Sequence, residues 1–236
     1  MKLLFSSALM LCSAAATAAP STTAPIKPFR AEYVAMRDGK ALAETTIEWR
    51  ANTDGTYTLK TSTKGTSGLA KLAGLDVTEV STLRWRDGVP ETTLYDFQQD
   101  AAFSSKERHA EIDWVKNSVA MNDNDKRATY DTVPGLIDRH AVVLALANDL
   151  ARDHPSFDYK VAMKNGIEDF RYEKLSNAAL TVPAGSFDAV VLERKRGSRT
   201  STTWISEKSG WVPVQIEQVD TKKKETITLQ LKSLKR

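Results

Sequence analysis

Apolar and polar residues alternate along most of this chain. In its last stretch, Ile227, Leu229 and Leu231 would point to one side of an extended segment, with polar residues between them. Because successive side chains of a β-strand point to opposite faces, this period of two predicts strands with one buried and one solvated face. Such runs occur at residues 29–33, 45–49, 57–62, 77–86, 91–98, 107–115, 157–163, 167–174, 179–182, 187–193, 200–205, 212–219 and 225–234.

Asp-Gly pairs separate several of these runs. They stand at 38–39, 54–55 and 87–88, and this dipeptide suits the positive φ angles of tight hairpin turns. Strands joined by such turns pair with their neighbours in the chain, so we expect an all-β fold, a long antiparallel meander of about 13 to 15 strands. A sheet of that size exposes its edges if it stays open, and we therefore expect it to curl into a barrel or half-barrel.

One segment departs from this period. Residues 138–152 are expected to form an α-helix, with Asp138 as its N-cap and Pro155 beyond its end. The stretch 141–147 is apolar on nearly every side, and a helix of that kind is usually buried all round. The sequence thus predicts one buried helix, near 138–152, that lies inside the curled sheet or closes one of its mouths.

The N-terminal 18 residues have the features of a secretory signal peptide. Lys2 precedes an uncharged apolar run, and Ala16-Thr17-Ala18 fits a cleavage site. We expect residues 19–28 to be a flexible lead-in and residues 29–236 to be a single barrel-like domain in the periplasm. No later segment has the roughly 20 apolar residues needed to cross a bilayer, so no transmembrane span is expected.

The cysteine content excludes a disulfide in the mature chain. Cys12 is the only cysteine and lies within the expected signal peptide. Lipoprotein processing is the alternative at this position, but Leu11 precedes the cysteine where a small residue would be expected.

Charge is spread along the chain rather than concentrated. The chain is 41% hydrophobic and 27% charged with a formal net charge of +3, so nothing favours a nucleic-acid partner. One basic cluster flanks Gly197, and it is interpreted as a solvated hairpin turn, with contact to an anionic head group as the alternative. Its members are Arg194, Lys195, Arg196 and Arg199.

The sequence contains no recognised catalytic motif and predicts no catalytic residue and no cofactor. The strongest chemical candidate is a row of side chains on one face of a strand, Glu107, His109 and Glu111, which Asp113 continues. Imidazole and carboxylates together can bind zinc or act as an acid and base pair. The opposite face is apolar, however, so the favoured interpretation is a solvated strand face.

Apolar residues in two regions are candidates for ligand binding. The glycine-rich stretch 65–75 could form the lip of a pocket, touch a membrane surface or pack as a short turn on the end of the barrel. The inward face of the helix would line a cavity, and one tryptophan beside a glycine would complete it. The residues concerned are Leu69, Leu72, Leu75, Val143, Leu146, Leu150 and Trp211.

The C-terminal third contains three distinctive runs: residues 182–191 (VPAGSFDAVV), Trp204-Ile205-Ser206 and residues 210–216 (GWVPVQI). With these runs the chain resembles a known bacterial family, the domain of unknown function 3108, and the segment 29–33 and the 138–152 helix fit the same layout. It implies an exported, predominantly β protein without an assigned activity or catalytic residues.

These observations favour a non-enzymatic periplasmic envelope protein, expected to be a monomer, that binds an apolar or amphiphilic ligand such as a lipid in a curved sheet. Two alternatives remain open. One is a structural or assembly factor that contacts other envelope proteins through its sheet edges. The other is an envelope hydrolase that uses the face of Glu107, His109 and Glu111.

Overall fold

The structure is a computed structural model that describes residues 24–102 and 104–236. The predicted signal peptide and the first part of the lead-in lie outside these residues. The described end of the lead-in packs against the fold, because Ile26 is buried and its carbonyl oxygen accepts a hydrogen bond of 3.0 Å from Trp49 Nε1.

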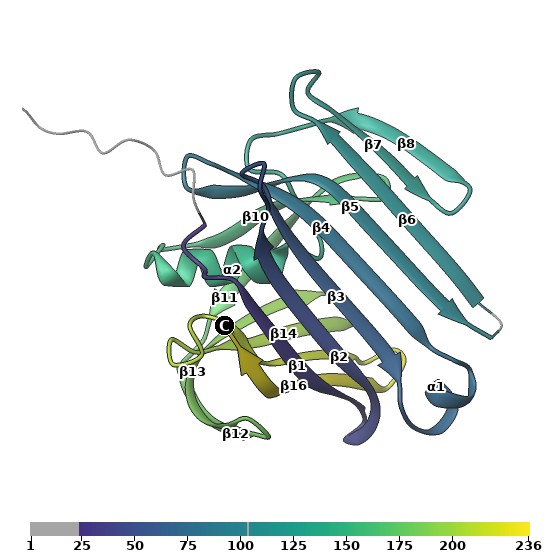
Figure 1. Ribbon diagram of the computed structural model, residues 1–236, viewed down its shortest axis with the longest axis vertical. Coiled ribbons are helices and arrows are strands. Elements are labelled where there is room, and N and C mark those ends of the chain that lie inside the picture. The colour runs from purple at the N-terminus through teal and green to yellow at the C-terminus, as the bar shows by residue number, and fades with distance from the viewer. Residues whose placement is uncertain (1–23, 103) are drawn as a thin grey trace, which may run out of the picture.

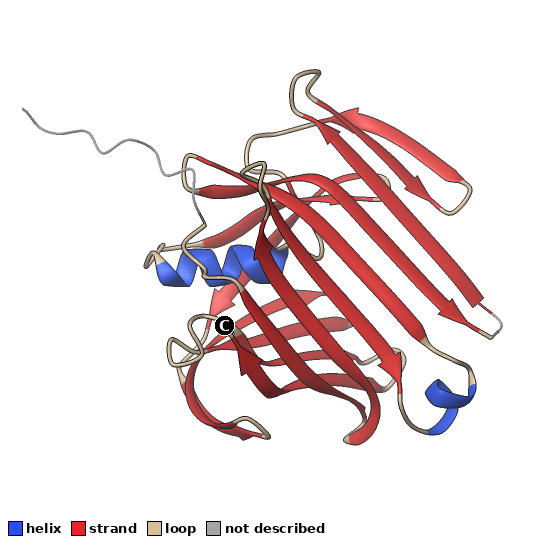
Figure 2. Ribbon diagram, viewed as in Figure 1, coloured by secondary structure: helices blue, strands red, loops and turns tan. Residues whose placement is uncertain are grey.

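The described residues form one large, almost entirely antiparallel sheet (Figure 2). The strand order is β8-β7-β6-β5-β4-β3-β2-β1-β16-β15-β14-β13-β11-β10-β9, and β12 pairs with β13 beside this path. The strands are β1 (Phe29–Arg37), β2 (Lys40–Ala51), β3 (Tyr57–Gly65), β4 (Asp76–Arg86), β5 (Val89–Ala101), β6 (Ser104–Asp113), β7 (Ser118–Asp123), β8 (Lys126–Asp131), β9 (Ile137–Asp138), β10 (Phe157–Met163), β11 (Gly166–Lys174), β12 (Ala178–Val182), β13 (Gly185–Arg196), β14 (Arg199–Ile205), β15 (Pro213–Asp220) and β16 (Glu225–Lys235).

The all-β prediction is confirmed, and the strands slightly exceed the predicted 13 to 15 because the sheet has sixteen in the described part of the chain. Hairpins form where Asp-Gly pairs predicted them. At 38–39 and 87–88 both turn residues have positive φ, 49° and 76° in the first pair and 52° and 81° in the second, as a two-residue hairpin turn requires.

The sheet curls strongly, but no ladder of hydrogen bonds closes it, so a complete barrel is not formed in the described residues. Its two ends approach each other through fewer contacts. The Tyr130 hydroxyl in β8 donates a 2.8 Å hydrogen bond to the Met163 carbonyl in β10, and the Thr92 amide in β5 donates one of 3.1 Å to Leu136. Ile112 and Val119 also pack across this junction.

The helix α2 (Val142–Ala151) is buried against the inside of the curl. Its start differs from the prediction, because Asp138 lies in β9 and Ala141 is the N-cap without a side-chain hydrogen bond. The reason is local. Asp138 Oδ1 accepts hydrogen bonds from the backbone amides of His140 and Ala141, which holds these residues in a turn before the helix begins.

Helix α2 lies inside the curl toward one end of the sheet (Figure 1). Near α2, both walls contribute to one core, in which Trp49 stacks on Tyr57 at 5.0 Å and lies 5.7 Å from Trp85. The short helix α1 (Gly68–Leu72) marks the opposite end. Toward α1, inward-facing residues such as Val77, Phe97 and Leu229 are only half-buried. We call this inner surface the concave face.

Candidate functional site

Polar residues interrupt the apolar inner face of β4. Val77, Leu83 and Trp85 share this face with Glu79 and Ser81, because side chains of a strand repeat every second residue. Sequence analysis did not select Glu79 or Ser81. The sequence does contain a signal for them, because two polar residues occupy positions of this strand where the period of two predicts apolar ones.

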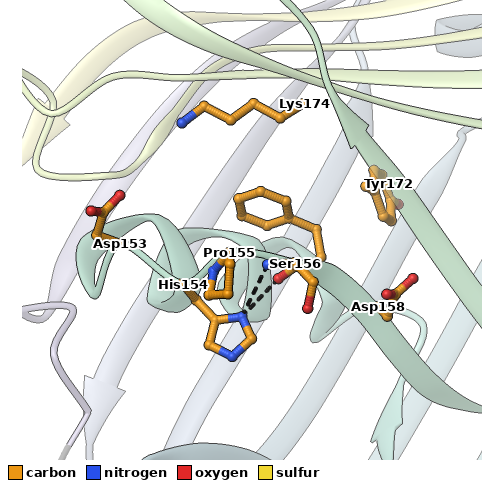
Figure 3. A pocket seen from close by; sticks show the side chains of 8 residues that line it. Asp153, His154, Pro155, Ser156, Asp158, Tyr172 and Lys174 are labelled. Carbon is orange, nitrogen blue, oxygen red and sulfur yellow. Dashed lines mark hydrogen bonds between the residues drawn. The ribbon is translucent and has the colours of Figure 1, made fainter.

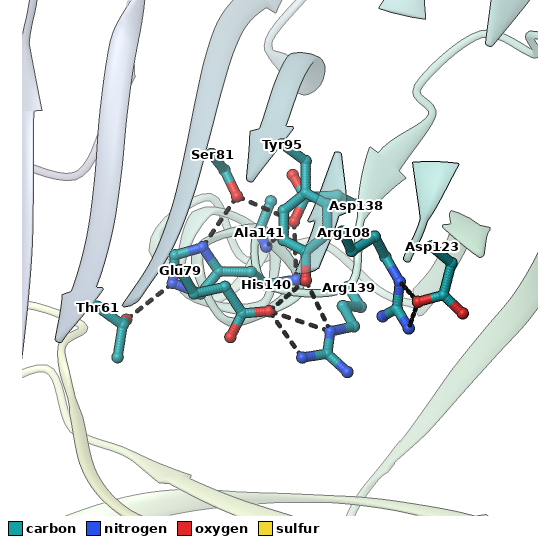
Figure 4. Close-up of polar contacts among 10 residues, drawn as sticks. All are labelled: Thr61, Glu79, Ser81, Tyr95, Arg108, Asp123, Asp138, Arg139, His140 and Ala141. Atoms are coloured by element: carbon teal, nitrogen blue, oxygen red, sulfur yellow. Dashed lines mark hydrogen bonds and ion pairs between the residues drawn. The ribbon is translucent and has the colours of Figure 1, made fainter. Parts of the chain in front are cut away.

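Asp138 lies at the centre of the polar network around Ser81 (Figure 4). Its carboxylate accepts hydrogen bonds from the hydroxyls of Ser81 at 2.9 Å and Thr92 at 2.8 Å. The amides of His140 and Ala141 add bonds of 2.8 and 3.0 Å. Burial raises the pKa of Asp138, although these hydrogen bonds and nearby His140 oppose the rise.

His140 is held between β3 and β4. Nδ1 lies 2.9 Å from Ser81 Oγ, and Nε2 lies 2.8 Å from Thr61 Oγ1. Because the Ser81 hydroxyl donates to Asp138, it accepts from Nδ1–H, and Nε2 then accepts from the Thr61 hydroxyl. Both ring nitrogens are thus satisfied in the neutral form.

A charged group adjoins this network on the concave face. Arg139 forms an ion pair of 2.9 Å with Glu79, and both contact the Tyr95 hydroxyl. Burial acts to raise the pKa of Glu79, but nearby His140, the Arg139 guanidinium and the hydrogen bonds from Tyr95 and Arg139 outweigh it, so the pKa lies below its usual value. The Arg139 guanidinium also lies 4.9 Å from the centre of the Phe97 ring, yet 38% of its side chain is exposed. Arg139 can therefore contact a ligand on the concave face.

Although it contains serine, histidine and aspartate, this network differs from a catalytic triad. In a triad the histidine stands between the serine and the aspartate and takes the serine proton. Here Ser81 stands between Asp138 and His140, and its side chain is fully buried. Ser81 is thus not positioned as a nucleophile.

Arg194 is a second cation on the concave face. Its register with Ser201 and Gln218 places it on the inward side of β13, and its guanidinium lies 3.4 Å from the centre of the Phe170 ring. The structure thus corrects the expectation of a solvated turn for this residue. The other members of its cluster are exposed and form ion pairs: Lys195 with Glu193, Arg196 with Glu168 and Arg199 with Asp220.

The structure separates the predicted ligand-binding residues into two groups. Leu69 and Leu72 on α1 are each 82% exposed, and Leu75 beside them is half-buried. Leu146 and Leu150 are buried in the core at the opposite end, where Val143 and Trp211 pack against it. The lip residues and the helix residues therefore do not line one common space.

The acidic row lies on the outer face of β6. Glu107 and Glu111 are exposed, and His109 Nδ1 lies 2.7 Å from Asp96 Oδ1. Among residues 24–102 and 104–236, no group of three or more His, Cys, Asp or Glu side chains could hold a metal ion. The row resembles a solvated strand face.

A surface depression of about 470 Å³ lies beyond the C-terminal end of α2 (Figure 3). Its lining includes His154, Phe157, Tyr172 and Lys174. His154 Nδ1 contacts the backbone of Ser156 rather than another ionisable side chain. Asp153, Asp158 and Lys174 also line the depression, but among the described residues none of them forms a hydrogen bond or ion pair with His154.

The pKa of His140 leads to a prediction about pH. Burial lowers this pKa, while the carboxylates of Glu79 and Asp138 act to raise it. The unfolded chain, with a histidine pKa of 6.5, therefore binds more protons than the fold, so stability falls as the pH drops below 6.5. We expect a smaller fall in His140→Asn than in wild type, measured by urea unfolding at pH values from about 7 to 5.

The raised pKa of Asp138 has the opposite sign. A carboxyl that is protonated more easily in the fold stabilises it as the pH falls. The informative quantity is therefore the difference between variant and wild type. His154→Asn, at an exposed position, is the matched control, and equal pH dependence in both variants would contradict the prediction.

Comparisons with known proteins support the fold. A β-barrel-like protein of domain of unknown function DUF1849 from Brucella abortus is similar over 90% of this chain and 98% of that chain, with 10% identity and a TM-score of 0.55. The Pseudomonas aeruginosa MucA/MucB complex matches 88% of this chain and 51% of that chain at 14% identity, but its TM-score of 0.35 is too low to support an argument.

The family is established by sequence. No curated protein matches the chain significantly, and no helix in the described residues is long and apolar enough to cross a membrane. The sequence matches the family described as "Protein of unknown function (DUF3108)" over residues 28–231, which confirms the predicted resemblance. The chain therefore belongs to the DUF3108 family.

Proposed function

We propose that this chain is a non-enzymatic periplasmic protein that binds an anionic amphiphile on the concave face. One observation carries the proposal: on the inward side of the sheet, Arg139 lies against the half-buried Phe97 ring and Arg194 lies against the buried Phe170 ring. Val77, Phe97 and Leu229 supply surface for an acyl chain, and the guanidinium groups supply donors for a carboxylate or phosphate head group.

The surroundings of Arg194 favour binding of an anionic ligand. Within the described residues, Arg194 forms no ion pair within 4.0 Å; the residue is half-buried, and its guanidinium lies over the Phe170 ring. Burial lowers the pKa of Arg194 by disfavouring its charged form. An anionic head group would offset this cost, since a charge-assisted hydrogen bond is stronger than a neutral one.

A serine hydrolase is less well supported. The buried Ser81 hydroxyl already donates to Asp138, and a nucleophile must reach its substrate. The polar network is better suited to hold Arg139 in place. Glu79 and Tyr95 fix the guanidinium from one side and leave part of it accessible.

The proposal predicts that removal of both arginine charges abolishes a preference for an anionic over a neutral head group. Binding of a fluorescent fatty acid is expected to weaken at least about 10-fold in Arg139→Gln/Arg194→Gln, because two charge-assisted contacts are lost. Binding of the corresponding fluorescent alcohol should change little. Titration of the purified mature protein measures both affinities.

Arg171→Gln is the matched control, because Arg171 adjoins Phe170 in β11 but points outward, with 81% of its side chain exposed. Circular dichroism checks that each variant is folded. The proposal fails if the double variant binds the fatty acid as tightly as wild type. It also fails if wild type binds neither probe and yields no lipid to mass spectrometry after solvent extraction.

A further inference from the structure

The turns at the α1 end of the sheet form one continuous rim. Three backbone contacts join neighbouring turns: Asp38 N to Thr226 O, Thr221 N to Ser198 O, and Thr66 N to Leu42 O, at 2.9 to 3.0 Å. Because alternate turns of an antiparallel meander lie at the same end of the strands, the β7–β8 and β10–β11 turns join this rim.

Basic side chains predominate on this rim. Several exposed lysines and one arginine take part in no ion pair within 4.0 Å among the residues that the structure describes. They are Lys40, Lys71, Lys106, Lys126, Arg127, Lys164, Lys222, Lys223 and Lys224.

Among residues 24–102 and 104–236, fewer acidic than basic groups on the rim lack an oppositely charged partner. The acidic groups are Asp38, Asp100, Glu107 and Asp125. Asp38 accepts a hydrogen bond from the Thr226 amide, and Asp100 accepts from Gln98 and Ser105. The side chains on the rim that lack an ion-pair partner therefore carry a net positive charge.

Two large apolar side chains project from the same rim. Leu69 and Leu72 are three residues apart on α1, so they point to the same side of the helix. Each is 82% exposed, and Lys71 stands between them. Exposed leucines beside lysines are typical of segments that enter the head-group region of a bilayer.

From these observations we infer that the α1 rim docks on an anionic phospholipid bilayer. The lysines attract the anionic head groups, and Leu69 and Leu72 insert between the lipids. This inference deepens the proposed function and rests on it for its biological meaning. The half-buried, inward-facing Val77 and Leu229 lie near the strand ends that carry the α1 rim. A bound amphiphile would then enter and leave at the membrane surface.

Vesicle co-sedimentation of the mature protein tests the docking. We expect binding to equimolar phosphatidylglycerol and phosphatidylcholine vesicles at low salt, and weak binding to phosphatidylcholine alone. Leu69→Ser/Leu72→Ser should lower the partition coefficient at least about 10-fold, since two leucines no longer leave water. Lys222→Gln/Lys223→Gln should lower it by about 10-fold at low salt and much less at high salt.

Controls come from the opposite end of the molecule. Val115 is 92% exposed and Lys116 adjoins it, in the turn between β6 and β7. Val115→Ser and Lys116→Gln should bind vesicles like wild type. If these controls lose as much binding as the rim variants, or if wild type does not bind anionic vesicles, the docking inference is overturned.

The two proposals can fail separately. The rim variants should bind the soluble fluorescent fatty acid with wild-type affinity, because neither leucine lies on the concave face. Vesicle binding without fatty-acid binding would overturn the proposed function and support the docking. Fatty-acid binding without vesicle binding would overturn the docking inference and support the proposed function.

Discussion

Replacement of Leu146 by alanine is expected to lower the free energy of unfolding by about 2–5 kcal/mol. Leu146 is 1% exposed and packs in the core that joins α2 to both walls of the sheet. The change removes buried apolar contacts and leaves a cavity that the surrounding strands fill only in part. Urea unfolding of wild type and variant measures the difference.

This result also separates two roles for the helix. If Leu146 lined a ligand cavity, as its sequence pattern suggested, truncation would change ligand affinity with little loss of stability. Packing in the core predicts the reverse. Val115→Ala, at an exposed position, should change stability by less than about 0.5 kcal/mol. A similarly small effect of Leu146→Ala would show that α2 is not part of the core.

Replacement of Asp138 by alanine is expected to cost about 3–5 kcal/mol of stability. The variant removes the acceptor of hydrogen bonds from Ser81, Thr92 and two backbone amides. The hydroxyls of Ser81 and Thr92 are fully buried, and each buried donor without an acceptor costs about 1–3 kcal/mol. Water that enters the space left by the carboxylate would recover part of this loss.

Two further variants make this test specific. Asp138→Asn retains an oxygen and the side-chain shape, so we expect a smaller loss of about 1–2 kcal/mol. Asp158→Ala removes a carboxylate whose side chain is 59% exposed and should change stability by less than about 0.5 kcal/mol. Equal effects of Asp138→Ala and Asp158→Ala in urea unfolding would contradict the structural role of the network.

The strands that escaped sequence analysis are those with little apolar content. The β7 segment has Val119 and Met121 as its only strongly apolar residues, and β8 is a short polar edge strand. The two residues of β9 pair in parallel with β10. Pairing of this kind is set by a distant partner, so it leaves no periodic pattern in the local sequence.

The polar network was out of reach for the same reason. Thr61 and His140 are 79 residues apart, and Glu79 and Arg139 are 60 apart. Each residue alone has an ordinary local setting. Curling of the sheet brings the Asp138–His140 turn against β3 and β4, and that contact creates the hydrogen bonds.

The sequence by itself determined the class of fold, most of the strands, several hairpin turns and the existence of an apolar helix. These properties depend on neighbouring residues, through the period of two and the backbone preferences of Asp-Gly. The tertiary structure decided where the sheet stops short of closure, where Arg139 and Arg194 lie, and which end the helix fills. Those depend on contacts between residues far apart in the chain, which form only after the sheet has curled.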